Sequence, residues 1–166
     1  MRLLKYIGIL FLTITLTGCG IYSFTGLTET PDSFQVNFFQ NNADLVEPGL
    51  DIQFTNALQD LIQNQTSAQL VTSGGEVIYE GEIVEYRIAP MTATSDNKAA
   101  QNRLTISVNV RYINTLDSEK DIEQRFSFFF DYGADEQLVG GLKDEAHEVI
   151  FERLTQDIIN ATLADW

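Results

Sequence analysis

Four segments of this chain alternate apolar and polar side chains, which is the two-residue period of a half-buried strand. They are residues 33–38, 76–89, 103–112 and 122–132. Two further segments, 50–66 and 142–163, repeat apolar residues at three- and four-residue spacing, the period of an amphipathic helix. The pattern therefore predicts the order strand, helix, three strands, helix.

The second of these strands changes phase part-way along its length. Its apolar residues as far as Ile83 occupy one face, whereas Val84, Tyr86 and Ile88 continue in the opposite phase. Such a slip indicates a β-bulge or a change of strand partner. Pro90, which has no backbone N–H to donate, then ends the strand.

Together these elements predict an α+β fold. We expect a two-layer sandwich in which a four-stranded, mostly antiparallel sheet carries two helices on one face, in the order β-α-β-β-β-α. The clean alternation of the last two strands indicates one dry face and one face in water. Phe129 is out of phase in the run Phe126 to Phe130 and falls on the wet face. It is therefore either covered by the fold or part of a partner interface.

The N-terminus has the layout of a bacterial secretory signal peptide. Arg2 and Lys5 precede an apolar run that is too short and wrongly flanked to be a transmembrane helix. The run ends in Leu16-Thr17-Gly18-Cys19. These four residues resemble the lipobox of bacterial lipoproteins, in which signal peptidase II cuts before a cysteine that carries a lipid.

This resemblance divides the chain into three parts. We expect a signal peptide over residues 1–18, a lipidated N-terminal segment over 19–32 and a single domain over 33–166. Cys19 is the only cysteine, so no disulfide is expected. Several acyl chains on Cys19 would anchor the protein to a membrane without a span. The alternative is that Cys19 is a spare thiol in an ordinary signal peptide.

The chain is strongly acidic, with 24 acidic residues against 10 basic ones. Two of the basic residues and none of the acidic ones lie in the predicted signal peptide, so the mature chain carries a net charge of about −16. Nucleic acid binding is disfavoured, because it needs a basic face. Attraction to an anionic lipid surface is disfavoured for the same reason. We interpret the acidity as serving solubility in the periplasm.

No residues have the spacing of an active site. Asp144 and the sole histidine, His147, lie three apart on a predicted helix, but a metal site needs three or four converging ligands. We therefore expect His147 on a solvated helix face. Glu80 and Glu82 point to one side of a strand, which is ordinary on an acidic surface. We expect no enzymatic activity, no metal, and no cofactor beyond the covalent lipid on Cys19.

A small group of basic residues could hold phosphate groups, since arginine can donate two parallel hydrogen bonds to one anion. Two of them lie on the wet side of the third strand, one in the loop before it and one near the end of the second strand. These candidates are Arg103, Arg111, Lys98 and Arg87. The alternative is cross-strand pairing of these arginines with carboxylates such as Asp121 and Glu123.

Three stretches resemble the Bacteroidetes form of the LptE family of lipopolysaccharide-assembly lipoproteins. They are Cys19-Gly20-Ile21-Tyr22-Ser23-Phe24-Thr25-Gly26, then Leu70-Val71-Thr72-Ser73-Gly74-Gly75, and the strand Asn102-Arg103-Leu104-Thr105-Ile106-Ser107-Val108-Asn109-Val110-Arg111-Tyr112. The first and the last are the more specific. The resemblance covers essentially the whole mature chain, including the predicted order of elements.

The resemblance implies a non-enzymatic lipoprotein of the outer membrane, facing the periplasm or a barrel lumen. Such a protein plugs and helps to assemble the large β-barrel LptD, which inserts lipopolysaccharide into the outer leaflet. Direct binding of lipopolysaccharide is also implied for the family. Two alternatives stay open: an auxiliary lipoprotein of an envelope ABC-type lipid transport system, and a surface lipoprotein that binds glycans.

Overall fold

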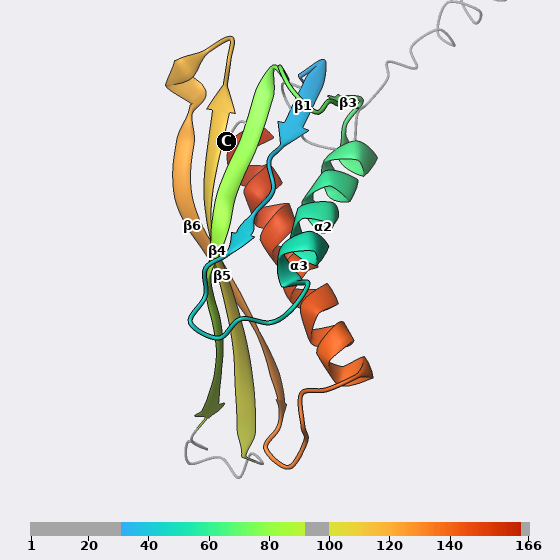
Figure 1. Cartoon of the computed structure of the whole chain (residues 1–166), viewed down its shortest axis with the longest axis vertical. Coiled ribbons are helices and arrows are strands. Elements are labelled where there is room, and N and C mark those ends of the chain that lie inside the picture. The colour runs from blue at the N-terminus through green and yellow to red at the C-terminus, as the bar shows by residue number, and fades with distance from the viewer. Residues whose placement is uncertain (1–30, 92–99, 164–166) are drawn as a thin grey trace, which may run out of the picture.

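The structure is a computed structural model that describes residues 31–91 and 100–163 (Figure 1). A twisted sheet forms one layer and two helices form the other. The strands are β1 (Ser33–Val36), β2 (Gln40–Asn41), β3 (Gln69–Leu70), β4 (Val77–Met91), β5 (Gln101–Asn114) and β6 (Ile122–Gly133). The helices are α2 (Leu50–Gln65), α3 (Gly141–Leu163) and the short 3₁₀ helix η1 (Ser118–Lys120).

The sheet is mixed and has more strands than predicted. Its order is β3-β1-β4-β5-β6, and β2 pairs with β4 further along the edge that β1 also uses. The β4–β5 and β5–β6 pairings are antiparallel, whereas β1 and β2 run parallel to β4 and β3 runs parallel to β1. The prediction of four strands is therefore wrong, and so is the predicted order, because β2 and β3 are two-residue strands too short to show a period.

Both helices cover the same face of the sheet, which confirms the predicted two layers (Figure 1). Helix α3 packs on β6 and β5, α2 packs beside β1, β2 and β3, and the two helices contact each other. Gly49, with φ at +79°, turns the chain into α2 immediately after Pro48. The fully buried side chains between the layers include Phe34, Phe54, Leu58, Ile62, Tyr79, Leu104, Ile106, Ile150 and Leu154.

A β-bulge in β4 confirms one of the two explanations of the phase slip. Ile83 pairs with Val108 and Glu85 pairs with Ser107, so Val84 is the extra residue. In a strand without the bulge, Val84 would face outward and Glu85 would face the helices. The bulge instead turns Glu85 to the outer face and buries Tyr86 in the core.

His147 is buried, so the expectation of a solvated histidine is wrong. Its side chain is 4% exposed, with Nδ1 3.2 Å from Oε1 of Gln53 and Nε2 3.2 Å from the hydroxyl of Tyr86. The ring also stacks on Phe151. The arrangement suits a neutral imidazole, with Nδ1–H donating to Gln53 and Nε2 accepting from Tyr86. Burial lowers the pKa of His147, and it raises the pKa of Tyr86 to about 12.

Candidate functional site

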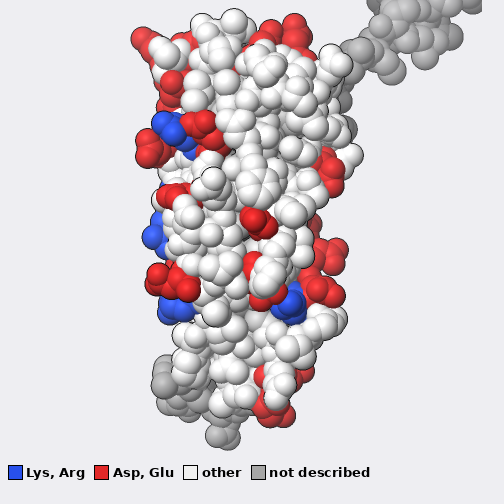
Figure 2. Space-filling model, viewed as in Figure 1, with Lys and Arg blue, Asp and Glu red and all other residues white. Residues whose placement is uncertain are grey.

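The outer face of the sheet gathers most of the arginines of the mature chain. Four of the five arginines after residue 18 project from β4, β5 and β6 on this side, and each of the four pairs with a carboxylate. They are Arg87, Arg103, Arg111 and Arg125. Figure 2 shows basic side chains mainly along the border formed by the sheet, whereas acidic side chains occur on both layers.

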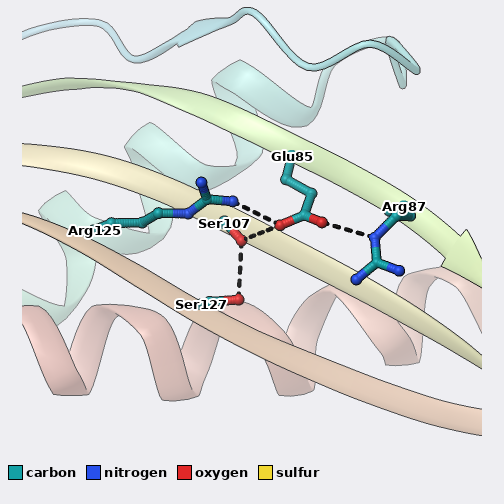
Figure 3. A network of polar contacts seen from close by, with 5 residues as sticks. All are labelled: Glu85, Arg87, Ser107, Arg125 and Ser127. Atoms are coloured by element: carbon teal, nitrogen blue, oxygen red, sulfur yellow. Dashed lines mark hydrogen bonds and ion pairs between the residues drawn. The ribbon is translucent and has the colours of Figure 1, made fainter.

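Glu85 is the centre of a network on this face (Figure 3). Its Oε1 accepts a hydrogen bond from Nε of Arg87 at 2.8 Å, and its Oε2 lies 2.7 Å from a guanidinium nitrogen of Arg125. The hydroxyl of Ser107 donates to Oε2 at 2.7 Å and lies 2.9 Å from the hydroxyl of Ser127. The hydrogen bonds from Arg87 and Ser107 lower the pKa of Glu85. Two arginines thus share one carboxylate, which leaves the network with a net positive charge.

Arg103 makes the most extensive contacts of these arginines. Two of its guanidinium nitrogens donate to the two carboxylate oxygens of Asp131 at 2.7 and 2.8 Å, a bidentate pair across the β5–β6 register. The guanidinium also lies 3.5 Å from the ring centroid of Phe129. This hydrogen-bonded pair lowers the pKa of Asp131. Phe129 is 40% exposed, so the fold covers it only in part.

A shallow depression lies on the same face, between β2, β4 and β5. Its volume is about 520 Å³, and it is open to solvent. Arg111 borders it and pairs with Glu80 at 2.7 Å, while Glu80 and Glu82 accept hydrogen bonds from Asn37 and Asn42 respectively. The full lining is Asn37, Phe38, Gln40, Asn42, Glu80, Gly81, Glu82, Asn109, Val110, Arg111 and Glu123. Amides and carboxylates dominate this surface, with Phe38 as an exposed apolar side chain.

The structure brings part of the expected binding group together. Arg87, Arg103 and Arg111 lie on one face, whereas Lys98 and Cys19 lie outside the described residues. The arginines pair with carboxylates other than the expected Asp121 and Glu123. Arg111 contacts Glu80 on β4, and Arg103 contacts Asp131 on β6. Arg125 belongs to the same face although it was not among the predicted candidates. The alternating pattern of β6 already placed Arg125 outward, and this could have identified it as a candidate.

The described residues include neither a candidate metal-binding cluster nor a candidate membrane-spanning helix. Within residues 31–91 and 100–163, no group of three or more histidine, cysteine or acidic side chains is arranged to hold a metal ion. In the same ranges, neither long helix is apolar enough to cross a membrane.

Comparison with protein families shows which family the chain belongs to. A family described as LptE, lipopolysaccharide-assembly, matches residues 32–162. The chain belongs to the LptE family. This membership assigns it to lipopolysaccharide assembly as an accessory lipoprotein, in a family that is not known for enzymes. No curated protein sequence matches the chain.

Several solved structures are similar to this LptE-family chain at low sequence identity. A hypothetical protein of Chlamydia trachomatis is 10% identical with a TM-score of 0.53, covering 78% of this chain and 94% of its own. A minor lipoprotein of Acinetobacter baumannii is 12% identical with a TM-score of 0.49, covering 80% and 91%. The rare lipoprotein B of Shewanella oneidensis is 10% identical with a TM-score of 0.43, covering 76% and 89%. The first of these supports the helix-covered sheet and nothing about function.

Proposed function

We propose that this protein is a non-enzymatic lipoprotein of the outer membrane that plugs the barrel LptD and helps to assemble it for lipopolysaccharide insertion. The observation that carries the proposal is the family match over residues 32–162. The lipobox ending at Cys19 supports the anchor, and a lipid there is the only attached group we propose.

The outer face of the sheet supports the role of a plug. Large barrels that enclose water have polar interiors. A protein held inside one must present solvated polar groups and not a dry apolar surface. The ion pairs around Glu85, Asp131 and Glu80 supply such a surface over β4, β5 and β6. The net charge of about −16 suits solvation better than a grip on phosphates over the whole molecule.

The arginines remain candidates for holding anionic groups of lipopolysaccharide. Arg87, Arg103 and Arg111, with Lys98, make up the proposed group. Each of the three described arginines already pairs with a carboxylate, so an anion would have to displace or share that carboxylate. The cluster around Glu85 has the easiest access to a shared anion, because two arginines there face a single negative charge.

Depletion of the protein in its native bacterium tests the proposed function. We expect lipopolysaccharide at the cell surface to fall and the barrel to accumulate in an unassembled form, measured by surface labelling and by heat-modifiable migration of the barrel. Restoration by a copy expressed in trans is the control. Normal surface lipopolysaccharide after full depletion would refute the proposal.

The anchor has a separate test. Cys19→Ala should leave the circular dichroism spectrum of the purified domain unchanged, since Cys19 lies before the first strand of the described fold. In cells that lack the barrel, the variant should move from the membrane fraction to the periplasmic fraction. A variant that stays in the membrane fraction of such cells would contradict lipidation at Cys19.

A further inference from the structure

The two edges of the sheet differ in how they are covered. β6 forms one edge, and the rings of Phe128 and Phe129 stack there with centroids 5.5 Å apart and planes at 22°. Consecutive residues of a strand point to opposite faces. Since β5 occupies the other side of β6, the two rings meet around the free edge. Arg153 lies 5.7 Å from the Phe128 ring centroid and Arg103 lies 3.5 Å from that of Phe129. Bulky aromatic and charged side chains thus crowd the middle of this edge, a feature by which edge strands limit further pairing.

The opposite edge has no such cover over the second half of β4. β1 pairs with residues 77–79 and β2 pairs with residues 82–83. From Val84 to Met91, no strand among the described residues pairs with β4 on that side, although pairing with β5 continues to Met91 on the other side. The backbone groups that point to the free side therefore stay available to another strand.

A hollow lies directly beside this free edge. Its volume is about 300 Å³, and its lining is Asp44, Leu45, Val84, Glu85, Tyr86, Arg87 and Ile88. Leu45 is 52% exposed and Ile88 is 43% exposed, so the rim of the hollow carries apolar side chains in contact with water. A free strand edge beside an apolar hollow fits an extended peptide, because backbone hydrogen bonds supply affinity and the hollow selects alternate side chains.

The charges around the hollow indicate which side chains the bound segment should carry. Asp44 stands at the rim and makes no ion pair with another described residue. The mature chain as a whole repels acidic segments, given its net charge of about −16. The hollow is lined by two carboxylates, Asp44 and Glu85, and by one cation, Arg87, which pairs with Glu85. A basic side chain in the added segment would therefore pair with Asp44. The occupant that fits best is therefore an extended segment with alternating aliphatic side chains and a lysine or arginine.

We propose that the free edge of β4, from Val84 to Met91, binds an extended segment of the barrel partner as an added strand. This inference rests on the proposed function. The strands of a closed barrel wall already pair with one another, so the segment belongs to a loop or a terminal extension of the barrel. Within this edge Pro90 has no N–H, so it can accept but not donate a backbone hydrogen bond to the added strand.

Photocrosslinking in native membranes tests this assignment. A benzophenone amino acid replaces Ile88 on the β4 edge or Phe129 on the β6 edge of the full-length, lipidated protein. The two positions are 43% and 40% exposed, so they are matched in access. Phe129 lies on the outer face proposed to face the barrel interior, so we expect crosslinks from position 129 to fall on strands of the barrel wall and crosslinks from position 88 to fall outside those strands. Mass spectrometry should place the crosslinks from position 88 in a loop or terminal segment with a basic residue.

The remaining outcomes separate the two proposals. Co-purification of the barrel with crosslinks from position 88 on strands of the barrel wall, or with none at position 88, would overturn the edge assignment and leave the proposed function intact. Failure of the barrel to co-purify with the unsubstituted protein would overturn both.

A pair of substitutions gives a second test without a crosslinker. Leu45→Lys removes an apolar side chain from the hollow and places a positive charge beside Asp44, where it would repel the basic side chain of the added segment. Leu45 is a half-exposed loop position, so we expect the fold to persist while recovery of the barrel falls by about tenfold. Leu116→Lys is the control, since Leu116 is 77% exposed on the turn after β5 and lies outside the hollow. Equal recovery of the barrel with both folded variants would contradict the assignment.

Discussion

The two faces of the sheet are held by different interactions. On the face toward the helices, side chains such as Leu104 and Ile106 are fully buried and fill a packed core. On the outer face, the intervening residues of the same strands form ion pairs and hydrogen bonds around Glu85 and Asp131. Packing energies are large and depend on shape, whereas pairs near water contribute little each. The inner face therefore determines stability, and the outer face is available for function.

The largest expected effect comes from Gly81 on the inner face. A Cβ at this position would lie 2.0 Å from the carbonyl oxygen of Asn109 and 2.7 Å from the ring of Phe39. Gly81→Ala should therefore lower the free energy of unfolding by about 4 kcal/mol, measured by urea denaturation. Gly133→Ala is the control, because its Cβ would meet mainly the flexible side chain of Glu136. A loss as small as the control's would show that the strands separate easily at Gly81.

Two adjacent residues of β5 compare the faces directly. Leu104 is fully buried and Thr105 faces outward. Leu104→Ala should lower the free energy of unfolding by about 3 kcal/mol through lost packing and a residual cavity. Thr105→Ala should change it by less than about 0.5 kcal/mol. Similar losses at both positions in chemical denaturation would contradict the assignment of stability to the inner face.

Stability should also depend on pH through His147 on the inner face. Its pKa is lowered in the folded state, so the unfolded chain binds the proton more tightly. The stabilisation is then fully present above the unfolded pKa of 6.5 and is lost as pH falls below it. We expect a decrease of about 1 kcal/mol between about pH 7.5 and pH 5.5.

The matched variant for this prediction is His147→Gln, which keeps hydrogen bonding toward Gln53 and Tyr86 but does not titrate. Its stability should be nearly flat over the same pH range. A wild-type curve that is equally flat would show that the imidazole is not held neutral by burial.

The smallest expected effect lies on the outer face. Glu85→Gln removes the carboxylate shared by Arg87 and Arg125, but these groups are partly exposed to water. The expected loss is about 0.5 kcal/mol at pH 7. Because the pKa of Glu85 is lowered from 4.5 in the folded state, the difference from the wild-type protein should vanish as pH falls below that value.

Glu119→Gln on η1 is the control for this last comparison, since its side chain is exposed. Thermal melts at neutral and acidic pH give the measurement. A loss at Glu85 as large as that of Leu104→Ala would contradict the division of roles between the two faces.

The sequence predicted most of the fold because its longer elements bury one regular face. The alternation in β4, β5 and β6 and the apolar spacing of both helices located these elements, and the phase change near Val84 located the bulge. β2 and β3 have two residues each, so periodicity could not reveal them. His147 was misplaced because α3 packs against both the sheet and α2 and buries a wider face than its apolar spacing suggests.

The site was less predictable because it depends on register. The sequence placed Arg103 and Arg111 on the outer face, but it could not indicate that their carboxylates come from Asp131 and Glu80. Glu85 on β4 contacts Arg125 on β6 only because the bulge turns the Glu85 side chain to the outer face. Such a contact between residues 40 positions apart has no local pattern.

The central claim is that this LptE-family protein works as the plug of a large barrel. The most direct measurement is purification of the tagged, lipidated protein from its native outer membrane in mild detergent, with partners identified and quantified by mass spectrometry. We predict one large β-barrel protein in equimolar amount. Recovery of transporter subunits would contradict the claim and favour an auxiliary role in an ABC-type lipid transport system, and recovery of the protein without a partner would contradict it as well.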